Sequence, residues 1–321
     1  MVKVRRGYRS KNVSVEGATG GRTGGLRLPQ STGGKAGAGA GGAGLLGVIV
    51  VVVITLLSGG GEGGLGDALG GLQSGQENNG TTAPPPAITE DELSEWSGIF
   101  DDVQFMWQDI FESAGLEYRD ARMRIFSGSI STACGTVPAE AGPFYCPGDD
   151  TVAFDPDFFE ELAARFGAEG DFAIAYVIAH ELAHHVQNVL GVSTDVRQQQ
   201  AGLGEVERNA LTIRLELQAD CLAGVWAFTA AQRPATLDGV DYHLHLEPGD
   251  LREGLQAAEA VGDDTIQEST GQQINTDNWS HGSAEQREAW LRIGLETGDP
   301  AVCNDTFDTS VAATEILPTQ P

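Results

Sequence analysis

Two histidines four residues apart form the pattern with the clearest chemical meaning in this 321-residue chain. They belong to the motif H-E-x-x-H, in which Glu181 lies between His180 and His184. An apolar run over residues 172–190 predicts a helix, so both imidazoles project from one face and can bind one Zn²⁺ ion at about 2 Å each. Glu181 then lies beside the metal and can take a proton from metal-bound water, which is the chemistry of a zinc peptidase.

A second pair of side chains with helical spacing could complete the site. Glu216 and Asp220 are four residues apart in a predicted helix over residues 205–232, among apolar neighbours that predict burial. Glu216 can be the third ligand, which leaves the fourth position for water, and Asp220 can accept the free ring N–H of a ligand histidine. An acidic pair on a solvated helix face is the alternative. His243 and His245 could bind metal instead, or form a solvated surface pair.

A third segment offers a hydrogen-bond donor for the transition state. His281 stands in a Ser-His-Gly turn before a helix whose start is predicted by the capping-box pair Ser283 and Gln286. Zinc peptidases commonly stabilise the oxyanion with a His, Tyr or Arg from a separate segment, so we predict this role for His281. Arg287, one turn into the same helix, is the alternative donor. A histidine that only orders the loop is the other interpretation.

The four cysteines all follow the most apolar segment of the chain, and their even number predicts two disulfides in an exported domain. Three pairings are possible. We predict Cys134–Cys146, which closes a short loop between strands, and Cys221–Cys303, which ties the Glu216 helix to the C-terminal segment. Zinc ligation by cysteine is the alternative, but the sequence contains no C-x-x-C motif.

The order of these motifs resembles known enzymes. H-E-x-x-H on one helix and E-x-x-x-D on a later one resemble the plan of the gluzincins. More closely, the chain resembles the bacterial family called putative neutral zinc metallopeptidases. The matching stretches are residues 5–7, 133–135, 142–147, 170–173, 175–181, 184–187, 215–221, 223–226, 281–283, 286–287 and 298–299. The resemblance spans nearly the whole chain and implies a membrane-tethered zinc peptidase, but it implies little about the substrate.

The chain divides into five regions of different composition. We predict a disordered basic cytoplasmic segment (1–43), a transmembrane anchor (44–57, extending upstream to about residue 36), a flexible linker (58–87), the zinc metallopeptidase domain (88–303) and a disordered tail (304–321). Basic residues flank the apolar segment only on its N-terminal side, so we expect a single-pass protein with an extracytoplasmic catalytic domain. A cleaved signal peptide is the alternative for the apolar segment.

The formal net charge of −27 is distributed unevenly. Basic residues gather before the apolar segment, and no lysine follows Lys35. A domain this acidic should repel the phosphate backbone, so we predict no nucleic-acid partner. The expected partners are a peptide or protein substrate and, through the anchor, the cell membrane.

Short segments ahead of the H-E-x-x-H helix predict a small sheet. They cover residues 122–126, 142–146 and 151–155. In zincin-like enzymes the strand before the catalytic helix is a sheet edge that binds extended substrate, so residues 151–155 are our candidate. Residues 262–279 should form a loop. We therefore predict an α+β fold: a zincin-like metallopeptidase domain with a small β-sheet and several helices, preceded by a single transmembrane helix.

Together these patterns predict a membrane-anchored peptidase that hydrolyses peptide bonds outside the cytoplasm. One Zn²⁺ ion per chain would be bound by His180, His184 and Glu216, and Glu181 would be the general base. The alternative is a catalytically silent, zinc-stabilised binding or adaptor protein tethered to the membrane, although such a protein would not need Glu181. A zinc amidase acting on cell-wall peptides would share the site and differ only in substrate.

Overall fold

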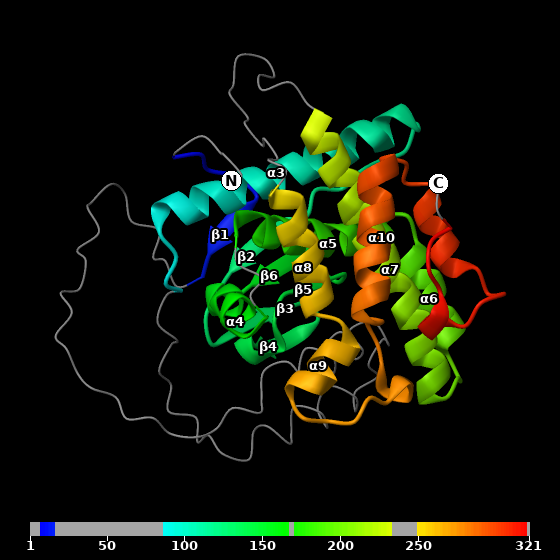
Figure 1. Cartoon of the computed structure of the whole chain (residues 1–321). Helices are drawn as coiled ribbons and strands as arrows, with labels where there is room; N and C mark the ends of the chain where they lie inside the picture. The colour runs from blue at the N-terminus through cyan, green and yellow to red at the C-terminus, as the bar shows by residue number, and fades with distance from the viewer. Residues whose placement is uncertain (1–6, 17–85, 167–169, 233–248, 320–321) are drawn as a thin grey trace.

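The computed structural model describes residues 7–16, 86–166, 170–232 and 249–319. Within these residues, helices form most of the structure and a small sheet lies to one side of them (Figure 1). The helices are α3 (Glu90–Ser113), α4 (Pro156–Phe166), α5 (Asp171–Val189), α6 (Val192–Gln200), α7 (Glu205–Gln232), α8 (Asp250–Ala260), α9 (Asp263–Ser269) and α10 (Ala284–Thr297). The strands are β1 (Val13–Val15), β2 (Arg122–Ile125), β3 (Ser129–Thr132), β4 (Gly135–Pro138), β5 (Phe144–Cys146) and β6 (Thr151–Phe154). Four short 3₁₀ helices are η1 (Ala139–Ala141), η2 (Thr276–Asn278), η3 (Val302–Phe307) and η4 (Ala313–Glu315).

The two helices that carry the predicted metal ligands lie in the middle of the domain. α5 is buried from Phe172 to Gln187 except at Ile174, because its apolar side chains leave almost no solvated face. α7 is buried over residues 212–227. Large side chains from several helices, such as Trp226 and Trp290, fill the core between them.

α10 packs unusually closely against α7, because each helix has a glycine at the contact. A side chain at Gly224 would clash with the backbone of Leu291, and one at Gly294 would clash with the backbone of Cys221. Backbones can approach this closely only where both positions lack a Cβ atom. The close packing brings Arg287, near the start of α10, to the part of α7 that carries Asp220.

The main sheet has the order β1-β2-β6-β5, and β3 and β4 form a separate antiparallel pair. β1, β2 and β6 run parallel, whereas β5 runs antiparallel to β6. The prediction that residues 151–155 form the substrate-binding edge is wrong, because β6 lies between β2 and β5 and pairs with both strands. The turn over residues 147–150 folds β5 back alongside β6, so β5 is the strand at this end of the sheet.

The predicted fold class is wrong. The domain is mostly helical with a small sheet, because each strand has only three or four residues while the core is built from long helices. In the part of the chain that the structure describes, no helix is long and apolar enough to cross a membrane, so the single preceding transmembrane helix is not found. The long helices α3 and α7 carry several charged side chains. The apolar segment predicted to span the membrane, residues 44–57, lies outside the described residues, as does the linker up to residue 85.

Both terminal segments contribute to the domain where the sequence predicts disorder. β1 comes from the basic segment before residue 43, and η3 and η4 extend beyond residue 303. The guanidinium of Arg214 on α7 donates to the backbone oxygens of Thr306 at 2.7 Å, Asp308 at 2.9 Å and Val311 at 2.5 Å. These segments lack apolar periodicity, so only their contacts with distant residues order them.

The predicted disulfides are confirmed. Cys134 pairs with Cys146 at a sequence separation of 12, and Cys221 pairs with Cys303 at a separation of 82. The first bond joins the turn between β3 and β4 to the end of β5. The second joins α7 to η3, so it holds the C-terminal segment against the helix that carries Glu216.

Candidate metal centre

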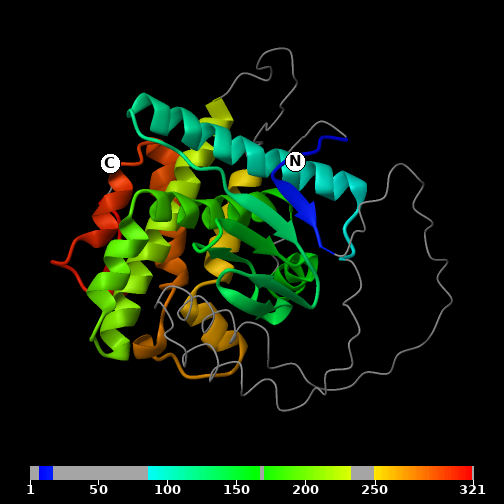
Figure 2. The ribbon, with the colours of Figure 1, turned by 180° about the vertical axis from the view of Figure 1, so that it is seen from behind.

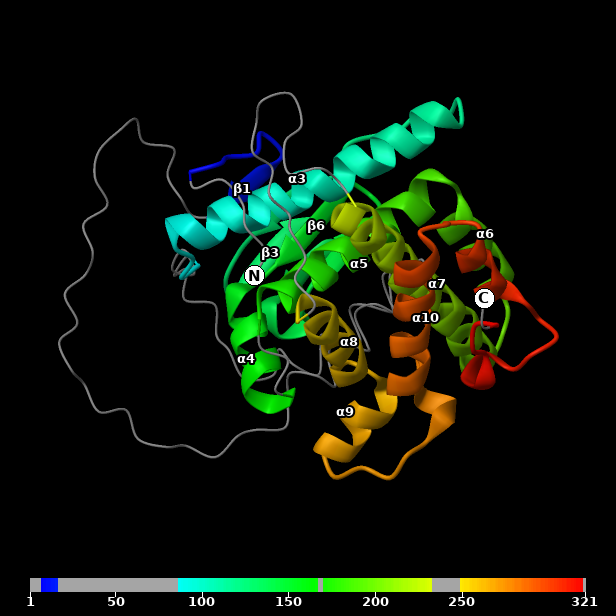
Figure 3. The ribbon, with the colours of Figure 1, turned by 45° about the horizontal axis from the view of Figure 1, so that its top comes forward.

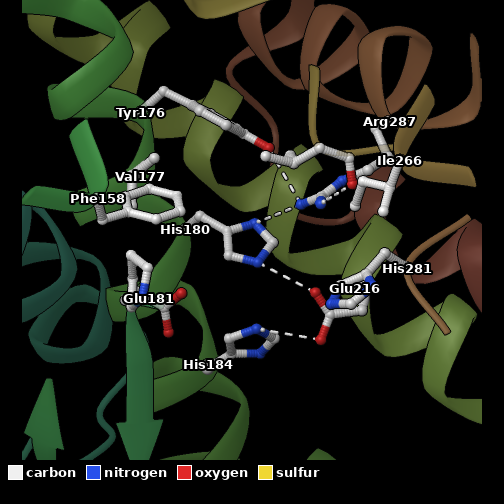
Figure 4. A pocket seen from close by; sticks show the side chains of 12 residues that line it. Phe158, Tyr176, Val177, His180, Glu181, His184, Glu216, Ile266, His281 and Arg287 are labelled. Atoms are coloured by element: carbon white, nitrogen blue, oxygen red, sulfur yellow. Dashed lines mark hydrogen bonds and ion pairs between the residues drawn. The ribbon is translucent and has the colours of Figure 1, made fainter. Parts of the chain in front are cut away.

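The structure brings His180, His184 and Glu216 together, although α6 separates the two helices along the chain. Nε2 of His180 lies 3.2 Å from Oε2 of Glu216, and Nε2 of His184 lies 3.4 Å from Oε1 of the same carboxylate. One ligand atom from each residue lies within 4.8 Å of the other two, and all three side chains are buried. Figure 4 shows the two imidazoles and the carboxylate turned toward one another. This group, which is the predicted ligand set, could hold one metal ion.

Hydrogen bonds on the far side of each imidazole orient the two rings. His180 Nδ1 lies 2.7 Å from Oδ1 of Asp220, and His184 Nδ1 lies 2.9 Å from Oε1 of Gln187. The amide nitrogen of Gln187 donates to the backbone oxygen of Leu215 at 2.7 Å and to Oε1 of Gln218 at 3.0 Å, so its oxygen must face His184. Carboxylate and amide oxygens only accept, which assigns the ring proton to Nδ1 in both histidines. Each Nε2 therefore keeps its lone pair for a metal.

Asp220 is held in a buried network that also contains Arg287 and Tyr176. Nε of Arg287 donates to Oδ2 of Asp220 at 2.8 Å, and its Nη2 donates to Oδ1 at 2.9 Å. The Tyr176 hydroxyl donates to Oδ1 at 2.6 Å. Burial alone would raise the pKa of Asp220, but the charges and hydrogen bonds of Arg287 and His180 hold that pKa at about 2. Asp220 is thus an ionised carboxylate that fixes the His180 ring.

Arg287 was predicted as the alternative oxyanion donor, but in the structure its guanidinium binds the carboxylate of Asp220. Besides binding Asp220, its Nη2 donates to the Tyr176 hydroxyl at 3.1 Å and its Nη1 to the backbone oxygen of Val261 at 3.2 Å. The Asp220 charge raises the pKa of Arg287 well above its ordinary value against the effect of burial. The guanidinium lines the cavity but is engaged in supporting the His180 partner.

The electrostatics of the three-residue group suit a cation. Burial lowers the pKa of His180, but the carboxylates of Asp220 and Glu216 together have the larger, opposite effect and raise this pKa to about 9. Burial opposes ionisation of Glu216 as well, yet His184 and His180 hold its pKa well below the ordinary value. Oε1 of Glu216 is buried without a hydrogen-bond partner, because the contact with His184 lacks hydrogen-bond geometry. Buried polar atoms are rarely left unpaired, and a metal ion would satisfy this one.

Glu181 and the ligand group line a shared cavity of about 60 Å³. In Figure 4 Glu181 lies on one side of the two histidines, and Glu216 and His281 lie on the other. Burial raises the pKa of the Glu181 carboxyl, against the opposing effect of the two histidines. Much of the remaining wall is apolar and is formed by Pro143, Phe158, Val177, Val261 and Ile266.

His281 lines the same cavity and is oriented by Asp263, the first residue of α9. Its Nδ1 lies 3.2 Å from Oδ1 of Asp263. The other carboxylate oxygen accepts the backbone N–H groups of Ser280 and His281 at 2.7 Å each and of Gly282 at 3.0 Å. The turn therefore wraps around one carboxylate, with Gly282 at a φ of 94° that favours glycine. A loop was expected over residues 262–279, but α9 begins there and supplies Asp263.

Three residues that support the site were not predicted: Gln187, Tyr176 and Asp263. The first two had a local signal, because Gln187 follows His184 by three residues and Tyr176 precedes His180 by four, so each shares a helix face with a ligand. Asp263 had none, because 18 residues separate it from His281.

Among the described residues, His185 does not join this group. His185 contacts the Tyr145 hydroxyl at 3.0 Å through Nδ1 and the backbone oxygen of Arg119 at 2.5 Å through Nε2, so its role is structural. His243 and His245, the alternative metal pair, lie outside the described residues.

Comparison with known proteins agrees with a metal site in this chain. A sequence model of the family described as "Putative neutral zinc metallopeptidase" matches residues 3–307. The uncharacterized protein YpfJ of Escherichia coli (strain K12) is 40% identical over 247 residues, which cover 76% of this chain and 82% of that protein. The uncharacterized protein Rv2575 of Mycobacterium tuberculosis (strain H37Rv) is 48% identical over 194 residues, which cover 60% of this chain and 64% of that protein. No solved structure gives a significant match.

Proposed function

The chain belongs to the putative neutral zinc metallopeptidase family, and we propose on this premise that it is a zinc-dependent peptidase with one Zn²⁺ ion per chain. The observation that carries the proposal is the buried group of His180, His184 and Glu216, with Glu181 on the wall of the same cavity. A zinc ion held by these three residues would polarise the scissile carbonyl and lower the pKa of a water molecule.

Separate side chains of the site transfer the proton, stabilise the oxyanion and orient the metal ligands. Glu181 accepts a proton from the attacking water and passes it to the leaving amine, since its carboxylate reaches the cavity. His281 in its doubly protonated form donates a hydrogen bond to the oxyanion through Nε2, while Asp263 accepts from Nδ1 and fixes the ring. Asp220 and Gln187 hold the ligand histidines, and Arg287 keeps Asp220 ionised. Glu181 argues against a silent adaptor protein, which would not need a base on the cavity wall.

The substrate would bind beside β5. This strand ends the order of the main sheet, and Pro143, immediately before it, lines the cavity. An extended peptide could pair with the outer edge of β5 and present its scissile bond to the site. The cavity has a volume of about 60 Å³. With walls that include Phe158, Val177 and Ile266, it suits an apolar side chain next to the cleaved bond.

The test is metal analysis followed by cleavage of a peptide library. The purified chain should contain one zinc ion and cleave peptides next to apolar side chains. A chelator should abolish cleavage, and added zinc should restore it. A chain that contains zinc but cleaves no peptide would support the adaptor alternative. Cleavage restricted to cell-wall peptides would favour the amidase alternative.

We also propose that the domain acts outside the cytoplasm. The support is that all four cysteines form disulfides, which persist in oxidising compartments and are rare in the cytosol. This location is tested below together with that of the N-terminal segment.

His281→Ala should lower kcat by about 10²–10³-fold, the usual effect of removing one oxyanion donor, and should leave the zinc content unchanged. The measurement is steady-state kinetics on a cleaved peptide alongside metal analysis. Asn278→Ala, an exposed change in the same loop, is the matched control. If His281→Ala loses zinc or unfolds, the residue is structural. If it keeps full activity, another donor stabilises the oxyanion.

A further inference from the structure

The outer edge of the main sheet is covered by a segment from the far N-terminal part of the chain. β1 pairs in parallel with β2, with Ser14 opposite Arg124 at the centre of the register. The N–H of Glu16 extends the pairing by donating to the backbone oxygen of Ile125 at 2.8 Å. Figures 2 and 3 show this strand beside α3 at the end of the sheet. The segment thus occupies an edge that would otherwise be open.

A buried carboxylate on α3 depends on the same segment. Asp101 is 5% exposed, and its two oxygens accept hydrogen bonds from the Tyr8 hydroxyl at 2.5 Å and the Ser10 hydroxyl at 2.8 Å. The N–H of Tyr8 also donates to the Ser94 hydroxyl at 2.8 Å. Burial raises the pKa of Asp101, and the two hydroxyls oppose this rise. The domain therefore carries a polar site shaped for these N-terminal side chains.

Charge complementarity adds to the docking. Arg9 pairs with Glu90, and Lys11 lies 3.9 Å from Asp120, so basic side chains of the segment face acidic ones of the domain. Each of these exposed pairs contributes little to the stability of the docked segment. The family match begins at residue 3, so it includes the whole segment.

The pairing has a consequence for membrane topology. Two strands that share hydrogen bonds must lie in one compartment, whereas a single membrane crossing between residues 16 and 86 would put β1 and β2 on opposite sides. We propose that residues 7–16, which include the edge strand β1, are part of the catalytic domain and lie in the same compartment as that domain. This departs from the cytoplasmic N-terminus expected from the charge pattern. The proposal stands on contacts remote from the metal centre and does not depend on peptidase activity.

The docking is tested with a cysteine pair in the full-length chain. Ser14→Cys and Arg124→Cys place two thiols on paired strands, at a separation a disulfide can bridge. The four native cysteines are already bonded, so these would be the only free thiols. A specific protease site inserted between residues 58 and 85 then separates the two parts. Under non-reducing conditions the fragments should stay linked in the Ser14→Cys/Arg124→Cys variant and separate in a Ser14→Cys/Glu268→Cys control. Separated fragments in both, or a crosslinked dimer, would overturn docking within one chain.

The single variants Ser14→Cys and Glu268→Cys, both at exposed positions, show whether the N-terminal segment and the domain lie in the same compartment. Intact spheroplasts are treated with a membrane-impermeant maleimide. If both positions are labelled, they share the exported side. If neither is labelled until the cells are permeabilised, they share the cytoplasm, which supports this proposal and overturns the proposed location. Labelling of position 268 alone would overturn the proposal.

Discussion

Glu181→Gln should bind zinc as well as the wild-type chain and lose peptide hydrolysis, with kcat lower by about 10²–10⁴-fold. Glutamine keeps the shape of the side chain but cannot accept the proton of the attacking water. Glu181 is 8% exposed and lies on the cavity wall opposite Glu216. Loss of the base therefore explains the loss of activity without a change of fold. The measurements are zinc content, thermal unfolding and single-peptide kinetics.

A matched control separates the loss of the base from the loss of a carboxylate in general. Glu160→Gln on α4 removes an exposed carboxylate and should leave kcat unchanged. Turnover close to wild type in Glu181→Gln would exclude Glu181 as the base and overturn the mechanism. Loss of zinc in that variant would instead place Glu181 among the groups that hold the metal.

Glu216→Ala should remove most of the bound zinc, and with it all measurable hydrolysis. The carboxylate is 1% exposed and faces Nε2 of both His180 and His184, so its removal leaves two neutral ligands. Two imidazoles alone fall short of the three protein ligands of a catalytic zinc site. Zinc content after dialysis against a weak chelator is the direct measurement. Added zinc should raise the unfolding temperature of the wild type, because it binds the folded state, and should not raise that of the variant.

Glu207→Ala, an exposed change near the start of the same helix, is the control and should keep its zinc. A Glu216→Ala variant with full zinc occupancy would show that another side chain is the third ligand. His243 and His245 would then be changed next, since they were the alternative pair in the sequence analysis.

Sequence alone determined the parts of the site that lie within one helix or one turn. H-E-x-x-H put His180 and His184 on one face of α5, and the spacing of Glu216 and Asp220 did the same on α7, because side chains four residues apart meet on any α-helix. The capping box of Ser283 and Gln286 was also local, since it joins groups three residues apart. The disulfide pairing was predicted from the loops that it would close.

Tertiary structure alone decided which of these local elements meet. The bond between Arg287 and Asp220 exists because Gly224 and Gly294 let α10 approach α7, and Asp263 reaches His281 because α9 begins beside that turn. The edge position of β5, the ordered C-terminal segment and the docking of β1 likewise depend on contacts between distant residues. Short strands and polar segments have too little hydrophobic periodicity to predict which distant residues they contact. Their order comes from hydrogen bonds and packing that only the folded chain supplies.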